Sequence, residues 1–120
     1  MHTEGKPAFK LAHIGINAEN PEESLAVARA FAALFDLGVK EGNSSNFAGT
    51  EVEVMKRPYH GRLGHIAFAT PDVEEAVGYC ESRGFAFDAS TAKYKDGVLN
   101  AIYFREEIGG FAIHLLRQKP

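Results

Sequence analysis

Apolar and polar residues alternate with a period of two along two similar stretches of the chain, residues 11–17 and 63–69. Such alternation predicts β-strands, in which successive side chains point to opposite faces. Each stretch carries a histidine at its third position, His13 in the first and His65 in the second. Because a helix-start signal follows each stretch, the pattern predicts a duplicated unit and one domain with pseudo-two-fold symmetry.

Two helices are predicted from their start and stop signals. Asn20 followed by Pro21 favours a helix start, so the first helix is expected over residues 21–37, with Gly38 as its stop. The second helix is expected over residues 71–83. Apolar residues of the first helix recur at helical spacing. The expected buried stripe consists of Ala28, Phe31, Ala32 and Phe35.

The remaining segments predict short strands separated by turns. Residues 85–88 form the strand expected after the second helix, and the assignment of residues 89–95 stays open. Lys95-Asp96-Gly97 is a hairpin-turn signal. The other expected strands cover residues 39–41, 47–48, 51–55, 98–105 and 111–117.

Composition is that of an ordinary single-domain globular protein. The chain has 120 residues, of which 45% are hydrophobic and 24% are charged, and this length suits one domain. We expect a flexible lead-in over residues 1–8 and a single domain over residues 9–120. Its two halves are expected at residues 9–57 and 62–118.

Charge, hydropathy and cysteine content argue against several kinds of partner and environment. A net charge of −3 argues against binding to nucleic acid or to an anionic membrane surface. No apolar run approaches the ~20 residues that a membrane span needs. The single cysteine, Cys80, excludes an internal disulfide framework and reads as a small core residue of the second helix. We therefore expect a cytoplasmic protein.

Four predicted strands each carry one side chain of metal-ligand type on the face opposite their bulky apolar residues. These side chains are His13, Glu53, His65 and His114. A single strand histidine is more often a packing or surface residue than a ligand, and His60 in the connector reads as a surface residue. The shared pattern favours a joint site, because the pseudo-symmetry would bring the four strands together. Three imidazoles and one carboxylate suit a divalent metal ion such as Zn²⁺, Ni²⁺, Fe²⁺ or Mn²⁺.

The chain resembles the vicinal oxygen chelate superfamily, which includes glyoxalase I, methylmalonyl-CoA epimerase, extradiol dioxygenases and bleomycin-resistance proteins. The motifs that carry the resemblance are His13-Ile14-Gly15, Val52-Glu53-Val54-Met55, Gly64-His65-Ile66-Ala67-Phe68 and Gly109-Gly110-Phe111-Ala112-Ile113-His114-Leu115. The resemblance implies an α+β fold, in which two βαβββ units form a curved mixed sheet with helices outside, and a homodimer. It also implies metal ligands at the four positions, usually His, Glu, His and Glu. His114 stands where the last Glu is common, which leaves the metal and the reaction open.

A narrower resemblance concerns the strings around residues 42–59, 92–94 and 109–112. They are similar to a glyoxalase-like module found alone or fused to 2-dehydro-3-deoxyphosphogluconate / 4-hydroxy-2-oxoglutarate aldolases. This resemblance implies a small 2-oxo or hydroxy acid as the ligand. The chain itself is too short for an aldolase barrel, which needs roughly 200 residues or more.

Three functions are compatible with these residues. The first is a metal-dependent lyase or isomerase of the glyoxalase type acting on a small organic acid, with Glu53 as the proton shuttle or as a ligand that also acts as one. The second is a non-catalytic module for small-molecule binding, in resistance or regulation. The third is an Fe-dependent ring-cleavage dioxygenase. The candidate substrate-binding residues are Asn43, Ser45, Lys56, Arg57 and Tyr94.

Overall fold

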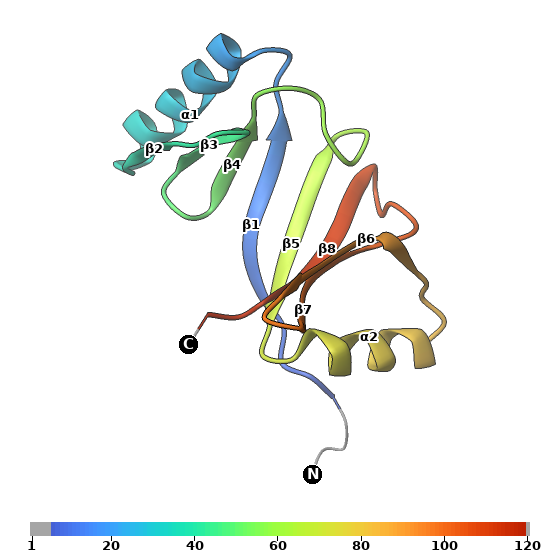
Figure 1. Ribbon diagram of the computed structural model, residues 1–120. Helices are drawn as coiled ribbons and strands as arrows, with labels where there is room; N and C mark the ends of the chain where they lie inside the picture. Colours follow the sequence, from blue (N-terminus) through green and yellow to red (C-terminus); the bar gives the residue numbers. More distant parts are fainter. Residues whose placement is uncertain (1–5, 120) are drawn as a thin grey trace.

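One curved sheet organises the computed structural model, which describes residues 6–119 (Figure 1). Its eight strands follow the order β2-β3-β4-β1-β5-β8-β7-β6. The strands are β1 (Lys10–Asn17), β2 (Val39–Glu41), β3 (Ser45–Ala48), β4 (Val52–Met55), β5 (Gly64–Thr70), β6 (Phe87–Lys95), β7 (Val98–Phe104) and β8 (Phe111–Arg117). The helices are α1 (Pro21–Phe35) and α2 (Val73–Ser82). Residues 1–5 of the predicted flexible lead-in lie outside the described residues.

The strand pairing repeats between the two halves of the sheet. In the first half β1 pairs in parallel with β4, and in the second half β5 pairs in parallel with β8. The halves are joined where β1 and β5 pair antiparallel at the centre. The predicted α+β fold of two βαβββ units is therefore confirmed.

Helix α1 begins as predicted and ends earlier. The side chain of Asn20 accepts a hydrogen bond of 2.8 Å from the backbone N–H of Glu23, which satisfies a free donor of the first turn. The predicted end at residue 37 was wrong, because Asp36 adopts the left-handed conformation (φ 56°) and caps the helix before Gly38. Aspartate tolerates this conformation better than most residues.

The buried face of α1 also differs from the predicted stripe. Ala28 and Ala32 are buried as expected, but Phe35 is 60% exposed at the helix end. Ser24 completes the buried face, because its hydroxyl donates a 2.8 Å hydrogen bond to the carbonyl of Val54. Because its hydroxyl is hydrogen-bonded to the backbone, this polar residue can be buried.

Helix α2 is shorter than the predicted span of residues 71–83, and its N-cap is Asp72. Its buried residues are Val73, Ala76 and Cys80, so the interpretation of Cys80 as a core residue is confirmed. The segment that follows differs from the prediction of a strand at residues 85–88. It forms one long strand, β6, whose pairing with β7 contains register shifts that obscure simple alternation.

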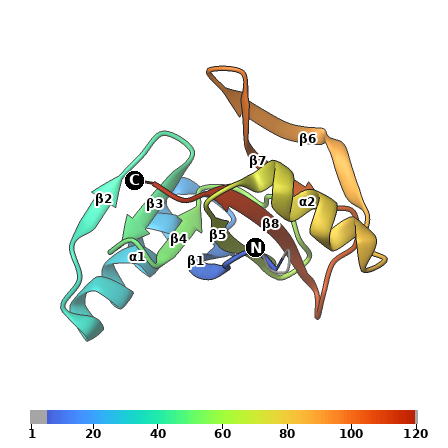
Figure 2. The ribbon, with the colours of Figure 1, turned by 90° about the horizontal axis from the view of Figure 1, so that it is seen from below.

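The helices pack mainly against the outer strands, α1 on β3 and β4 and α2 on β7 and β8. Figure 2 shows them as separate layers at the two ends of the sheet. Each covers its own apolar cluster, centred on Val54 in the first half and on Leu115 in the second. Because side chains alternate along strands, Glu53 and His114 point to the opposite, helix-free face. Neither helix within residues 6–119 has the length and apolar character needed to cross a bilayer.

Gly15 is a position where a side chain would disrupt the centre of the sheet. It is the register partner of His65 across the β1–β5 pair, and a Cβ atom there would overlap the His65 ring. We expect Gly15→Ala to lower the free energy of unfolding by about 1–3 kcal/mol, as overpacking does, in urea denaturation.

Gly78→Ala is the matched control, because Gly78 lies within α2 and a Cβ atom there meets open space. Alanine should stabilise this helix by up to about 1 kcal/mol. Equal effects of the two substitutions would contradict the close approach at Gly15.

Candidate metal centre

Four adjacent strands supply the four predicted ligands to one place. His13 lies on β1, Glu53 on β4, His65 on β5 and His114 on β8, and these strands are neighbours in the order β4-β1-β5-β8. The structure therefore brings together all four residues that the sequence analysis singled out as ligands.

Two small residues make room for these side chains. Gly15 is the register partner of both Glu53 and His65, and Ala67 is the partner of both His13 and His114. Gly15 and Ala67 each stand two residues after a site histidine, so they occupy equivalent positions in the two halves. Because the side chains at these two positions are small, the larger side chains on the neighbouring strands can approach one another above them.

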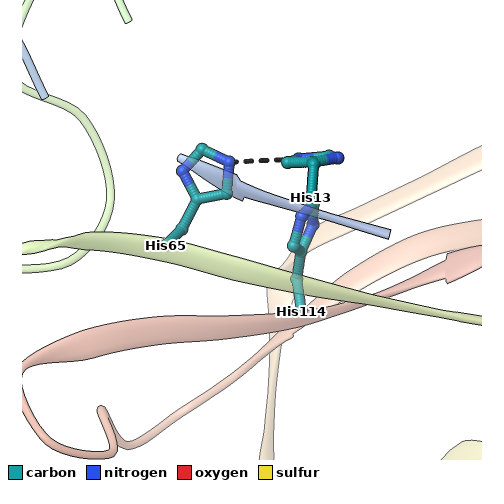
Figure 3. A group of neighbouring side chains, drawn as sticks. All are labelled: His13, His65 and His114. Atoms are coloured by element: carbon teal, nitrogen blue, oxygen red, sulfur yellow. Dashed lines mark hydrogen bonds between the residues drawn. The ribbon is translucent and has the colours of Figure 1, made fainter. Parts of the chain in front are cut away.

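Three of the four groups are close enough to share one ion. Oε1 of Glu53 lies 3.0 Å from Nε2 of His65 and 3.2 Å from Nε2 of His13. The two Nε2 atoms are 3.3 Å apart, and the dashed line in Figure 3 marks this contact between the two rings. Two ligands at right angles on an ion with bonds of about 2.1 Å stand about 3.0 Å apart. The observed spacing fits three neighbouring ligands of one divalent metal ion.

The hydrogen-bonding capacity of the cluster also favours a shared metal ion. For both rings to donate to the same oxygen of Glu53, each Nε2 must carry a hydrogen. The two N–H groups of His13 and His65 would then face each other across 3.3 Å. A shared cation removes this conflict, because it binds the lone pairs of both nitrogens and the carboxylate together.

His114 stands beside this group of three. Its nearest ring nitrogen and those of His13 and His65 all lie within 4.8 Å of one another. Its ring stacks on Tyr103 with centroids 4.3 Å apart and planes inclined by 14°, which fixes its orientation. Both of its nitrogens are buried without a hydrogen-bond partner among the described residues, which is costly unless a ligand binds them.

The electrostatics keep Glu53 and His114 in the protonation states that metal ligands need. Burial acts to raise the pKa of Glu53, but hydrogen bonds from His13, His65 and Ser45 outweigh it and hold the pKa well below its usual value. Burial and the nearby charges of His65 and His13 lower the pKa of His114 to about 3. At neutral pH the carboxylate is therefore ionised, and the His114 imidazole is neutral with a free lone pair.

The predicted substrate-binding residues divide into two groups. Ser45 is buried in the site, where its hydroxyl donates a 2.7 Å hydrogen bond to Oε2 of Glu53. Asn43 and Arg57 are exposed, Lys56 is half-buried, and Tyr94 is 64% exposed. The described residues that line the cavity at the histidines do not include these four, and their substrate-binding role stays a prediction.

That cavity has a volume of about 330 Å³ and includes residues that the sequence analysis did not identify as site residues. They include Thr91, Lys93 and Asn100 on β6 and β7, together with Tyr59, and Tyr103 of β7 also lines the cavity. Residues 89–95 could not be assigned to a strand, so nothing in the sequence indicated which face Thr91 and Lys93 would occupy. Burial raises the pKa of Tyr103, as do Tyr59 and Glu53, so its phenol stays protonated.

No family model matches the sequence, and no curated protein matches it. The fold does match solved structures over nearly the whole chain. A methylmalonyl-CoA epimerase from Mycobacterium tuberculosis has a TM-score of 0.66 and 14% identity, covering 92% of this chain and 88% of that chain. The chain therefore has the glyoxalase-like fold.

Two further matches have the same architecture. A variant of Streptomyces coelicolor methylmalonyl-CoA epimerase, in complex with 2-nitronate-propionyl-CoA, has a TM-score of 0.65 and 16% identity and covers 96% of this chain and 100% of that chain. A hypothetical protein from Bacillus halodurans has a TM-score of 0.63 and 16% identity, with 94% and 96% covered. At these identities the likeness establishes the fold, and the reaction must be argued from the site.

Ser45 provides a test of how the carboxylate is held. We expect Ser45→Ala to weaken Zn²⁺ binding about 10- to 100-fold in a competition titration with a chelating dye, because partners that orient a ligand contribute this much. Ser44→Ala is the matched control, since the neighbouring Ser44 lines the histidine cavity and its backbone carbonyl accepts a hydrogen bond from the backbone N–H of Lys56 whatever the side chain.

His65→Ala should retain no metal, because it removes the most buried of the candidate ligands. Full metal occupancy in that variant, or equal losses in the two serine variants, would contradict this arrangement of ligands.

Proposed function

We propose that this protein is a metal-dependent isomerase of the glyoxalase type. In this proposal it moves a proton at the carbon beside a carbonyl group in a 2-oxo acid, hydroxy acid or related organic acid. The observation that carries the proposal is the convergence of Glu53 Oε1 and the Nε2 atoms of His13 and His65 at 3.0–3.3 Å. The epimerases among the structural neighbours support this reaction class, because an epimerase inverts a carbon by removing and returning a proton.

In this proposal His13, Glu53 and His65 hold the ion, with His114 as the fourth ligand. A bound divalent ion would supply Lewis-acid stabilisation of negative charge on adjacent substrate oxygens. An ion held by these residues would lie beside the cavity that they line, where a substrate could reach it.

Glu53 is our candidate for the proton shuttle as well as a ligand. Its two oxygens have different surroundings, because Oε1 faces the histidines and Oε2 accepts the hydrogen bond from Ser45. Its low pKa suits a ligand, and proton transfer requires that the carboxylate become more basic when substrate excludes water from the site. His114 is the alternative acceptor, because its imidazole is neutral and lacks partners among the described residues.

Lys93 is our candidate for binding the acid group of the substrate. It is the cationic residue among those that line the 330 Å³ cavity, and an ammonium group pairs well with a carboxylate. Asn100 and Thr91 add neutral hydrogen-bonding groups to the same wall. Lys56 and Arg57, the cations among the predicted substrate-binding residues, do not line this cavity.

Deuterium exchange tests the proposed reaction. Protein loaded with Zn²⁺, Ni²⁺ or Mn²⁺ should exchange the proton beside the carbonyl in at least one member of a panel of 2-oxo acids, 2-hydroxy acids and methylmalonyl thioesters in D₂O, as followed by NMR. We expect Glu53→Gln to slow this exchange at least about 100-fold, the usual contribution of a positioned acid or base.

Glu41→Gln is the matched control, because Glu41 is an exposed glutamate of β2 that does not line the histidine cavity. The proposal fails if the metal-loaded protein exchanges no member of the panel. If His114→Gln abolishes exchange while Glu53→Gln does not, the shuttle is His114.

A ring-cleavage dioxygenase is the second candidate, and one observation favours it. Two histidines and one carboxylate on one side of an ion, with open positions opposite, are typical of non-haem Fe²⁺ oxygenases. Iron-loaded protein that consumes oxygen in the presence of catechols would select this function over the isomerase. Protein that binds small acids but retains no metal would favour the non-catalytic binding module instead.

The narrower link to 2-dehydro-3-deoxyphosphogluconate / 4-hydroxy-2-oxoglutarate aldolases gains no support from the compared structures. The same holds for a lyase reaction. Both stay predictions from sequence, and the panel of 2-oxo acids tests the ligand that they imply.

The outer face of the central strands supports the predicted homodimer. Ile14 is 40% exposed there and pairs in register with the half-buried Ile66, between the two helix layers. We expect the 13.1 kDa chain to sediment as a dimer and Ile14→Glu to sediment as a monomer. Leu34→Glu is the control, because Leu34 is 73% exposed on α1, away from this face. A monomeric wild-type protein would contradict the prediction.

A further inference from the structure

A second, larger cavity adjoins the metal centre on the helix-free face of the sheet. Its volume is about 640 Å³, which is within the range of pockets that hold small-molecule ligands. It shares His13 and Leu116 with the smaller cavity at the histidines. The two cavities therefore adjoin at His13, one of the candidate metal ligands.

The inner surface of this larger cavity is mostly apolar. Its apolar residues come from β1, β3, β5 and β8 and are Leu11, Ala12, Phe47, Ala69 and Leu116. The proton-transfer reaction proposed above uses none of them. Such a surface gains free energy by covering a hydrocarbon chain or ring, roughly in proportion to the apolar area removed from water.

Cationic side chains surround this apolar surface. The four cations among its lining residues are Lys10, Lys40, Arg117 and Lys119, against the single carboxylate of Glu51. All four are exposed, and their clustering contrasts with the net charge of −3 for the whole chain. An anion bound among them would be stabilised by several cations at once.

We propose that this cavity, which we call the tail groove, binds the extended tail of the substrate. The tail is an alkyl or aryl chain that ends in an anionic group, a phosphate or a carboxylate. The apolar chain covers Phe47, Ala69 and Leu116, and its terminal anion pairs with Lys40 and Arg117. Placement of the substrate's acid head at the histidines rests on the proposed function, whereas binding of the tail rests on the groove alone.

Alkyl phosphates provide a direct test of the tail groove. Hexyl, heptyl and octyl phosphate, below their micelle-forming concentrations, are titrated calorimetrically into the full chain with EDTA present. Affinity should rise about fourfold with each added methylene group. Octyl phosphate should bind at least tenfold more tightly than octanol, and comparison with nonanoate shows whether the groove prefers phosphate or carboxylate.

Charge variants locate the binding. Lys40→Gln/Arg117→Gln should weaken octyl phosphate at least tenfold, whereas the control Arg29→Gln/Arg105→Gln, which removes two exposed cations elsewhere, should leave it unchanged. Ala69→Glu should abolish binding by placing a carboxylate among the apolar lining residues, and Ala69 is only half-buried, so the variant should fold. Equal weakening in the two double variants would overturn the proposal, as would an affinity that does not depend on chain length.

The same titration separates the tail groove from the metal centre. His65→Ala should lose metal and still bind octyl phosphate, because His65 does not line the groove. If wild-type protein binds no alkyl phosphate while metal retention and proton exchange persist, the tail groove is wrong and the proposed function stands. If tail binding persists without any proton exchange, the proposed function is wrong and the tail groove stands.

Discussion

The antiparallel pairing of β1 with β5 is the constraint on which the rest of the structure depends. It joins the two βαβββ halves and sets the register that places Gly15 opposite His65 and Ala67 opposite His13. The parallel partners β4 and β8 then bring Glu53 and His114 to the same place. A slip of one residue in this register would turn the ligands of one half away from those of the other, so the fold and the site depend on the same hydrogen-bonded pair.

Packing and chemistry are divided between the two faces of the sheet. Both helices cover the face that carries the apolar side chains, and each completes a separate cluster in its own half. The opposite face can therefore hold polar groups at a depth where an unpaired charge would otherwise be costly. The ionised carboxylate of Glu53 is stable there because His13, His65 and Ser45 all contact it. The same contacts keep it ready to bind a cation.

The two cavities on this face differ in the ligand chemistry that they favour. The smaller one offers ligand nitrogens, hydroxyl groups, an amide and Lys93 around a narrow space. The larger one offers an apolar floor with cations around it. His13 belongs to both, so the candidate metal centre lies at the junction between a polar reaction site and a site suited to an extended organic anion. This division gives a physical basis for a substrate with a reactive acid at one end and a charged tail at the other.

The sequence by itself determined the duplication, the strand and helix types, and the four ligand candidates, because these depend on local periodicity and on residue chemistry. It did not determine the ends of the helices, where Asp36 took the position expected of Gly38, because caps that differ little in energy compete there. Nor did it reveal Thr91, Lys93 and Asn100 as cavity residues or Ser45 as the partner of Glu53. Only the tertiary structure decided these contacts. They join β3 to β4, and they join β6 and β7 to the central strands. The residues involved are separated in sequence, so no local pattern indicates that they meet.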